Sequence, residues 1–339
     1  MTSLAERQHA NILLKEAPLA SVQQDPACAV PGLGEHSAQT RTKPRAIYAT
    51  VLNQQYSYSE SCHANFLDLR EQAIATVNRY GWSGTPEKFL EPYCEPLGND
   101  YRLLQGVKFD TRSGAQVIKL FDETVKQGRF LQVAIANANT INLARANDNY
   151  HVLLRNVLVL NDGIGISIAS QLKYRRKFSE NLNGTDFIPR YLAESRVKLR
   201  VFLLGAPSDV AKACFEQCRQ RFPQHEWLGF NHGYFSSTQH HSICERIRET
   251  RPDVLLVGMG NPLQEFWIHQ YGASTGAKLC IGVGGLFDFL AGRVNRAPRW
   301  VRRLRCEWVY RLAIEPRRMW RRYLIGNLTF LLAAWRESA

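Results

Sequence analysis

Short apolar runs alternate with longer amphipathic segments from about residue 101 onward. The apolar runs lie at residues 131–136, 157–160, 197–204, 253–257 and 279–283. Runs that are apolar at nearly every position are typical of strands buried on both faces of a parallel sheet. Between them, apolar residues recur at helical spacing in residues 142–155, in the segment after Ser208, which we expect to cap its helix, and in residues 263–271. The alternation predicts an α/β fold, a mostly parallel sheet covered by helices.

The rest of the chain is organised differently. Residues 1–45 are rich in Ala, Ser, Gln and Pro without periodicity, and we expect them to be disordered. Residues 46–100 form an irregular N-terminal extension of unknown role, with one predicted helix at 64–79. The α/β core is expected at residues 101–292, and a basic helical appendage at 293–339.

Small and polar residues follow the predicted strands. In a parallel sheet the carboxyl ends of the strands line one rim, where open α/β folds bind their ligands. The residues expected on this rim are Asn137, Asn139, Asp162, Gly205, Asn261, Gln264, Glu265, Gly284, Gly285 and Asp288. Glycines let backbone N–H groups approach a phosphate closely, so the rim suits a nucleotide or a sugar. Polar loops occur at this edge in every α/β protein, however, and Asp162-Gly163 also fits an ordinary turn.

A dinucleotide-dependent oxidoreductase is the obvious alternative. Its G-x-G-x-x-G fingerprint follows the first strand of the fold. Here the glycine-rich segment GVGGLFDFLAG, residues 282–292, follows the last predicted strand. That order argues against NAD, and we expect no cofactor.

The net charge of +13 is concentrated near the C-terminus. Residues 293–339 contain twelve arginines and three glutamates, so they hold nine of the thirteen net positive charges. Trp300 and Trp308 lie at helical spacing among these arginines. Arginine interleaved with tryptophan fits a helix in a membrane interface, although a solvated basic face on a core-packing helix is the alternative. No recognised nucleic-acid-binding fold accompanies the charge, so we expect no nucleic acid partner.

Localisation and redox state follow from what the sequence lacks. No apolar run approaches the roughly 20 residues that span a bilayer, and the N-terminus has no signal-peptide pattern. The eight cysteines form no C-x-x-C pair and no metal set. We therefore expect a cytoplasmic protein, peripheral on the inner face of the cytoplasmic membrane, with reduced thiols and no metal.

Several ordered motifs resemble the WecG/TagA/CpsF family of glycosyltransferases. They are NDGIG (161–165), NGTD (183–186), LLGAP (203–207), GMGNPLQE (258–265), GVGGLFDFLAGRVNRAPRW (282–300) and EWVYRLAIEPRRMWRRYL (307–324). The resemblance covers about residues 101–325. It implies a Rossmann-like core and an inverting, metal-independent transfer from a UDP-sugar to a polyprenyl-diphosphate-linked sugar at the membrane, in cell-surface polysaccharide synthesis.

The resemblance also implies roles for individual residues. Asp162 falls on the family's proposed catalytic carboxylate and Gln264 on its nucleotide-proximal glutamine, and we expect Asn137 and Asn139 to be catalytic residues together with Asp162. The residues implied to bind diphosphate or membrane are Arg296, Arg311, Arg318, Arg321, Trp300 and Trp308. Two positions depart from the family pattern: Asn137 stands where relatives have Thr, and Asn181 where many have Arg.

Elementary chemistry is consistent with these roles. Inverting transfer is a single displacement that needs one base, and an aspartate is ordinarily ionised at neutral pH. The charge that develops on departing UDP needs a metal or fixed cations. The chain has no D-x-D metal motif, so the appendage arginines are the candidates. We expect Gly163 and Gly165 to leave room for a sugar beside Asp162.

The sequence leaves three matters open. The donor sugar is N-acetylmannosamine, its uronic acid or glucose. The protein is either a monomer or a homo-oligomer. The alternative function is a nucleotide-sugar-binding scaffold within a polysaccharide synthase complex, impaired in catalysis because Asn181 replaces Arg.

Overall fold

An eight-stranded sheet forms the centre of the protein. The structure is a computed structural model and describes residues 100–294, 297–298, 309–310, 312, 320 and 325–338. The strand order is β1-β2-β4-β3-β8-β7-β5-β6. The strands are β1 (Tyr101–Leu104), β2 (Val107–Asp110), β3 (Leu131–Ala136), β4 (Leu158–Asn161), β5 (Arg200–Gly205), β6 (Glu226–Asn231), β7 (Val254–Gly258) and β8 (Leu279–Gly282). Only β1 pairs antiparallel in this sheet; all other pairings are parallel. The predicted α/β fold with a mostly parallel sheet is confirmed.

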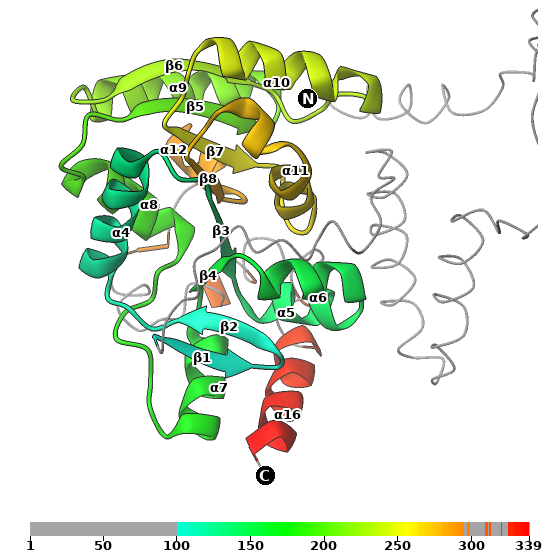
Figure 1. Cartoon of the computed structure of the whole chain (residues 1–339). Coiled ribbons are helices and arrows are strands. Elements are labelled where there is room, and N and C mark those ends of the chain that lie inside the picture. Colours follow the sequence, from blue (N-terminus) through cyan, green and yellow to red (C-terminus); the bar gives the residue numbers. More distant parts are fainter. Residues whose placement is uncertain are drawn as a thin grey trace, which may run out of the picture. The chain divides into compact units, whose positions relative to one another are not determined.

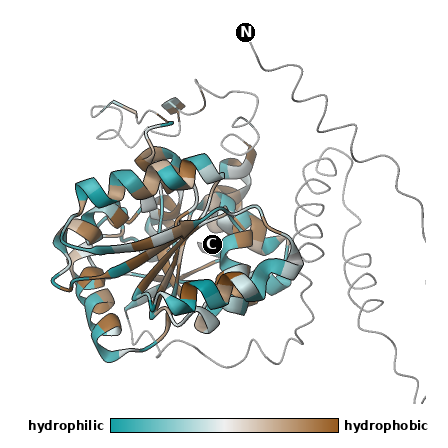
Figure 2. Ribbon diagram, turned by 90° about the horizontal axis from the view of Figure 1, so that it is seen from above, coloured by the Kyte–Doolittle hydropathy of each residue, from teal (hydrophilic) through white to brown (hydrophobic). Residues whose placement is uncertain are grey.

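Helices cover both faces of the sheet (Figures 1 and 2). One face packs against α4 (Gly114–Gln127), α8 (Gly184–Glu194), α9 (Ser208–Arg221) and α12 (Leu286–Leu290). The other face packs against α5 (Ala138–Arg145), α6 (Asp148–Arg155), α10 (His240–Glu249) and α11 (Leu263–Tyr271). Successive strand residues alternate between the two cores, as a pleated strand requires: Ile135 and Leu160 join one, Ala134 and Val159 the other. In Figure 2 the apolar strands run between amphipathic helices.

The five strands predicted from apolar runs are all present, with ends shifted by up to three residues. Two helix predictions need correction. The segment 142–155 is two helices, α5 and α6, because the Asn147 side chain accepts a hydrogen bond from the Tyr150 N–H and begins a new helix. Ser208 is the first residue of α9 rather than its cap. The extended residue Pro207 occupies the N-cap position and makes no side-chain cap bond.

The end of the chain packs onto the core beside the predicted catalytic loop. Helix α16 (Gly326–Ser338) lies against α5 and α7 (Ile164–Tyr174), as Figure 1 shows. Phe330 on α16 is fully buried. A Cβ placed on Gly165 would lie 3.4 Å from the Ala138 Cβ and 3.8 Å from the Phe330 ring. The space left by Gly165 is therefore used for helix packing, whereas nothing lies within 4 Å of such an atom on Gly163.

Polar contacts fix the same helix at both ends. The Asn142 amide donates to the Gly326 carbonyl at 2.7 Å near the start of α16. Near its end, Lys173 on α7 forms an ion pair with Glu337 at 2.6 Å. The last part of the basic C-terminal segment is thus an integral part of the core beside α7.

Several predictions concern residues that the structure does not describe. The predicted disorder of 1–45, the extension before residue 100 and the helix at 64–79 lie outside the described residues. So do Arg296, Trp300, Trp308, Arg311, Arg318 and Arg321. Every helix in the described part of the chain is too short or too polar to span a bilayer.

Replacing Phe330 with Ala should lower the free energy of unfolding by about 3–5 kcal/mol, the usual cost of emptying a buried aromatic site. Leu328→Ala on the same helix is the matched control, because Leu328 is 59% exposed. That variant should change stability by no more than about 0.5 kcal/mol. Chemical denaturation of both variants measures the difference, and equal stabilities would contradict the observed docking of α16.

Candidate active site

Asp162 lies directly after β4, at the carboxyl edge of the sheet. Its N–H donates to the Ala136 carbonyl at 2.9 Å, which extends the pairing of β4 with β3 by one residue. Gly163 follows with a φ of 90°, a conformation that favours glycine, and α7 begins at Ile164. The turn predicted by the Asp-Gly pair is therefore present. It leaves the half-buried carboxylate at the rim.

Asn137 orients this carboxylate. Its amide nitrogen donates to Oδ2 of Asp162 at 3.2 Å. Its amide oxygen accepts from the Thr140 N–H at 3.2 Å and caps α5. One side chain thus begins a helix and holds the carboxylate, while the catalytic role predicted for Asn137 stays a prediction. Asn139 lies in the first turn of the same helix.

Asn181 supports the turn from the other side. Its side-chain oxygen accepts the N–H of Gly163 at 2.8 Å. The neighbouring backbone is fixed as well, because the Leu182 N–H donates to the Asn161 carbonyl at 3.0 Å and the Asn161 amide donates to the Glu180 carbonyl at 2.9 Å. Asn181 therefore holds the loop behind Asp162, a contact that its side-chain oxygen makes and that an arginine could not make.

Glycines bring the other strand ends into close contact. A Cβ on Gly205 would lie 2.4 Å from the Gly258 carbonyl oxygen, and one on Gly258 would lie 3.1 Å from the Gly284 carbonyl oxygen. Beyond β6, the Gly233 N–H donates to the Ala206 carbonyl at 2.9 Å. The loops after β6, β5, β7 and β8 therefore stack backbone against backbone. This edge is therefore lined by backbone groups.

Helix α8 connects the two halves of the rim. A Cβ on Gly184, its first residue, would lie 3.3 Å from the Ile135 side chain and 3.6 Å from the Val283 carbonyl oxygen. The preceding Asn183 caps the helix by accepting the Asp186 N–H at 3.0 Å. The loop that carries Asn181 thus leads to the meeting point of β3 and β8.

Gln264 and Glu265 lie behind the rim rather than on it. Gln264 is 1% exposed, and its side-chain oxygen accepts the N–H groups of Gly260 at 3.2 Å and Gly284 at 2.9 Å. It therefore ties the loop after β7 to the loop after β8. Glu265 is fully buried, and both residues lie against Gly282, where a Cβ would be 2.8 Å from the Gln264 amide nitrogen. In this arrangement both side chains are engaged within the protein, and the donor contact predicted for them stays a prediction.

Tyr150 on α6 completes a buried network around Glu265. Its hydroxyl donates to Oε2 of Glu265 at 3.1 Å, while Asn261 and Gln264 donate to Oε1 at 2.8 and 2.7 Å. Burial raises the pKa of Glu265 to about 7, although the bonds from Gln264 and Tyr150 oppose the shift. Tyr150 was not predicted as a site residue, because its place on the apolar face of a helix looks like ordinary core.

The structure thus brings the predicted residues together in two groups. Asp162 and Asn137 form one at the ends of β3 and β4. The second, at the ends of β5, β7 and β8, contains Gly205, Asn261, Gln264, Glu265, Gly284, Gly285 and Asp288. Among the described residues, no group of three or more His, Cys, Asp or Glu side chains could hold a metal ion. The four described cysteines are free thiols and buried.

Comparison with known proteins adds to this geometry. A family model described as "Glycosyl transferase WecG/TagA/CpsF family" matches residues 101–339. A Bacillus subtilis (strain 168) protein named N-acetylglucosaminyldiphosphoundecaprenol N-acetyl-beta-D-mannosaminyltransferase is 35% identical over 178 residues, 52% of this chain and 68% of that protein. A protein of the same name from Staphylococcus aureus (strain MRSA252) is 31% identical over 221 residues, 64% of this chain and 85% of that protein.

The buried carboxylate predicts a specific pH dependence of stability. Because the pKa of Glu265 rises from 4.5 to about 7 on folding, the folded protein keeps a proton that the unfolded chain loses. Stability from this group is present below pH 4.5 and is lost as pH rises to about 7, by on the order of 3 kcal/mol. Glu265→Gln lacks this titration, so its stability relative to the unmodified protein should rise between pH 5 and pH 8. Denaturant unfolding at several pH values measures this, and parallel profiles would contradict the assignment.

Proposed function

Because the chain belongs to the WecG/TagA/CpsF family of glycosyltransferases, we propose that it transfers N-acetylmannosamine from its UDP derivative to a polyprenyl-diphosphate-linked N-acetylglucosamine. The names of the relatives from B. subtilis and S. aureus support this donor sugar and this acceptor. UDP as the carrier is consistent with the glycine-lined edge formed by the loops after β5, β7 and β8, which we call the nucleotide edge. The product would serve cell-surface polysaccharide synthesis.

The proposed base is Asp162, and its position at the rim is the observation that carries the proposal. The acceptor hydroxyl attacks the anomeric carbon of the donor while Asp162 takes its proton, and UDP leaves from the opposite face. Asn137 holds one oxygen of the carboxylate at 3.2 Å, and Asn181 fixes the turn behind it through Gly163. A base held in place by two amide side chains is oriented before the substrate arrives, which lowers the entropic cost of the reaction.

Asn181, which stands where many relatives have Arg, is not the residue that we propose to stabilise the charge on the departing diphosphate. Its amide oxygen accepts the Gly163 N–H, and the side chain carries no charge. We assign the charge on the departing diphosphate to Arg311, Arg318 and Arg321, with Arg296 as a further candidate. This assignment comes from the family motifs and from the concentration of arginine in residues 293–339.

A membrane-facing surface fits the lipid-linked acceptor. We define the α16 stripe as Ile325, Leu328, Leu332 and Trp335, which are 39–59% exposed and lie on one side of the helix. On the neighbouring α7, Ile164 and Ile168 are also exposed, and Ile164 follows Asp162 by two residues. Contact of these apolar side chains with a bilayer would bring the lipid-linked sugar to the proposed base.

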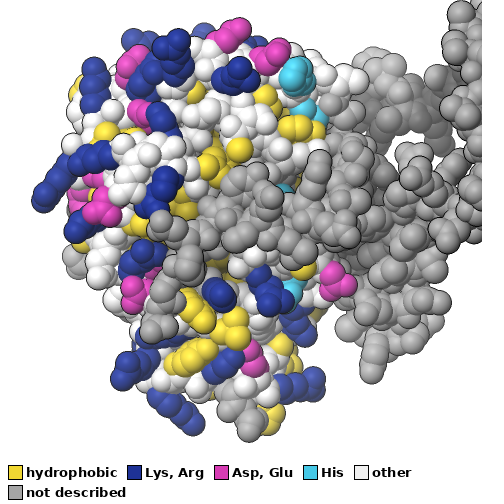
Figure 3. Space-filling model, viewed as in Figure 1, with side chains coloured by type: hydrophobic (Ala, Val, Ile, Leu, Met, Phe, Trp, Pro, Cys, Tyr) yellow, Lys and Arg dark blue, Asp and Glu magenta, His cyan; other side chains and the backbone are white. Residues whose placement is uncertain are grey.

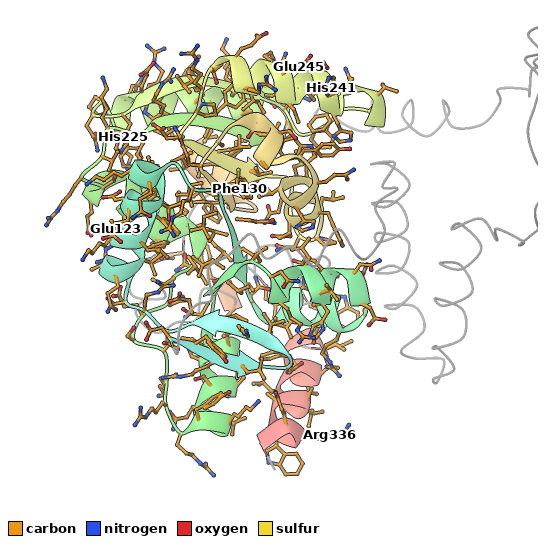
Figure 4. The ribbon with its side chains drawn as sticks, viewed as in Figure 1. Glu123, Phe130, His225, His241, Glu245 and Arg336 are labelled. Carbon is orange, nitrogen blue, oxygen red and sulfur yellow. The ribbon has the colours of Figure 1, made fainter. Side chains whose placement is uncertain are left out.

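Positive charge accompanies these apolar residues. Arg175, Arg176 and Lys177 follow α7 and are exposed. Figure 4 shows Arg336 projecting from the end of α16, and Figure 3 shows Lys and Arg side chains around hydrophobic ones on the lower part of the face in view. Apolar and basic side chains together favour an anionic membrane surface.

Asp162→Asn tests the base. The variant should keep its fold and lose about a hundredfold to ten-thousandfold in the rate of sugar transfer, the range that a general base contributes. Asp148→Asn, an exposed position on α6, is the matched control and should leave the rate unchanged. Product formation with UDP-N-acetylmannosamine and a short-chain polyprenyl-diphosphate acceptor is the measurement. Wild-type turnover by the Asp162→Asn variant would remove Asp162 from this role.

Combined replacement of Leu328, Leu332 and Trp335 with Ser tests the membrane surface. We expect partitioning onto vesicles containing anionic phospholipid to fall by about tenfold or more, because apolar area no longer leaves water. Tyr234→Ser is the control, since Tyr234 is 69% exposed and follows β6 at the opposite end of the sheet. Co-sedimentation measures binding, and unchanged partitioning of a folded triple variant would eliminate the α16 stripe as a membrane contact.

A further inference from the structure

Glu265 makes no contact that the transfer reaction itself requires. Its side chain is fully buried, behind the nucleotide edge rather than on it. A charge in such a place is costly unless its hydrogen bonds are satisfied. Three donors meet it: the Tyr150 hydroxyl, the Asn261 amide and the Gln264 amide, at 3.1, 2.8 and 2.7 Å. The network therefore points to a role exerted through these partners.

Asn261 is the partner that reaches the rim. It is half-buried, and its Nδ2 donates to Oε1 of Glu265 at 2.8 Å and to the Tyr150 hydroxyl oxygen at 3.3 Å. Both amide hydrogens are thus directed inward. The Asn261 Oδ1 is neither buried nor hydrogen-bonded within the described part of the chain.

The polarity of this amide is imposed by its neighbours. A carboxylate only accepts hydrogen bonds, and the single Tyr150 proton already goes to Glu265, so Tyr150 can only accept from Asn261. Rotating the amide by 180° would set its oxygen against the carboxylate and against the phenol oxygen. Glu265 and Tyr150 therefore leave one orientation, in which an amide oxygen faces the rim.

The same carboxylate also orients Gln264, but the Gln264 side-chain oxygen bonds to the protein backbone rather than facing the rim. Its nitrogen faces Glu265, and its oxygen accepts from the backbone of Gly260 and Gly284. Gln264 is consequently engaged within the protein, which leaves Asn261 as the member of this network available to a ligand. Because Tyr150 comes from α6, whose C-terminal end leads into β4, the network also joins the nucleotide edge to the half of the sheet that carries Asp162.

We propose that Glu265 and Tyr150 are positioning residues that fix the Asn261 amide so that its oxygen accepts a hydrogen bond from a hydroxyl or N–H group of the nucleotide sugar. The inference rests on the proposed function, since it takes the nucleotide sugar as the ligand of this edge. Glu265→Gln offers one acceptor and one donor where the carboxylate offers two acceptors. The network then no longer dictates which way Asn261 points.

A double-mutant cycle measured by calorimetric binding of UDP-N-acetylmannosamine tests the inference. Asn261→Ala should weaken binding about tenfold, and Glu265→Gln about fivefold. Glu265→Gln added to Asn261→Ala should weaken it no further, because the side chain through which Glu265 acts is gone. Tyr150→Phe should weaken binding about threefold. If Glu265→Gln does not fold, Tyr150→Phe takes its place in the cycle with Asn261→Ala. The same measurements with UDP alone locate the contact. Weaker binding of UDP by Asn261→Ala assigns the contact to the nucleotide, and unchanged binding of UDP assigns it to the sugar.

Two readouts separate positioning from a merely structural role. Gln132→Met removes a buried bond to the Glu265 backbone carbonyl, so it should lower the melting temperature and leave affinity unchanged. Affinity of the unmodified protein should fall as pH drops through about 7, where Glu265 takes up a proton, and this dependence should vanish in Glu265→Gln. Tyr150, which faces Glu265 from α6, does not titrate there, because burial raises its pKa well above 10.

The outcomes distinguish the inference from the function on which it rests. If the unmodified protein binds neither UDP nor UDP-N-acetylmannosamine, the proposed function is overturned, and the inference with it. If the unmodified protein binds, but Glu265→Gln weakens binding equally with and without Asn261, the inference alone is overturned. A pH profile that Glu265→Gln shares with the unmodified protein would overturn it as well.

Discussion

The buried carboxylate of Glu265 is the interaction around which the proposed nucleotide edge is built. Three side chains donate to it, and through Gln264 it fixes the backbone of Gly260 and Gly284. Its charge opposes folding above neutral pH, because burial raises its pKa to about 7. A protein that retains such a group gains a defined arrangement of polar atoms, which a core of apolar side chains would not provide.

The two halves of the rim differ in structure. At the ends of β3 and β4, Asn137 donates to the Asp162 carboxylate, and Asn181 accepts the N–H of Gly163 in the turn that follows it. At the ends of β5, β7 and β8, glycines allow the backbone loops to touch one another. Helix α8 and Tyr150 link the halves, and α16 packs against Gly165 in the half that contains Asp162. The α16 stripe thus lies on a helix that packs close to the loop of Asp162, which agrees with the proposed approach of a lipid-linked acceptor.

Much of the fold follows from the sequence because apolar runs and helical periodicity are local signals. The strands at residues 131–136 and 157–160 and the helix at 263–271 agree with the structure to within a residue. Features that depend on packing between distant segments of the chain could not be predicted in the same way. The space at Gly165 is occupied by Ala138 and by Phe330, which lies 165 positions later in the chain. Glu265 follows a strand and was predicted on the rim, but it is buried. Tyr150 carried no signal, since only the fold brings it to Glu265.

Simultaneous measurement of UDP release and sugar transfer tests the central claim most directly. The purified protein is given UDP-N-acetylmannosamine, the polyprenyl-diphosphate-linked acceptor, or both. A transferase that uses Asp162 as its base predicts UDP release only with both substrates, in equal amount to the disaccharide formed and with inverted anomeric configuration. Tight binding of the sugar nucleotide without UDP release in the presence of acceptor would contradict the account and identify a nucleotide-sugar-binding scaffold instead.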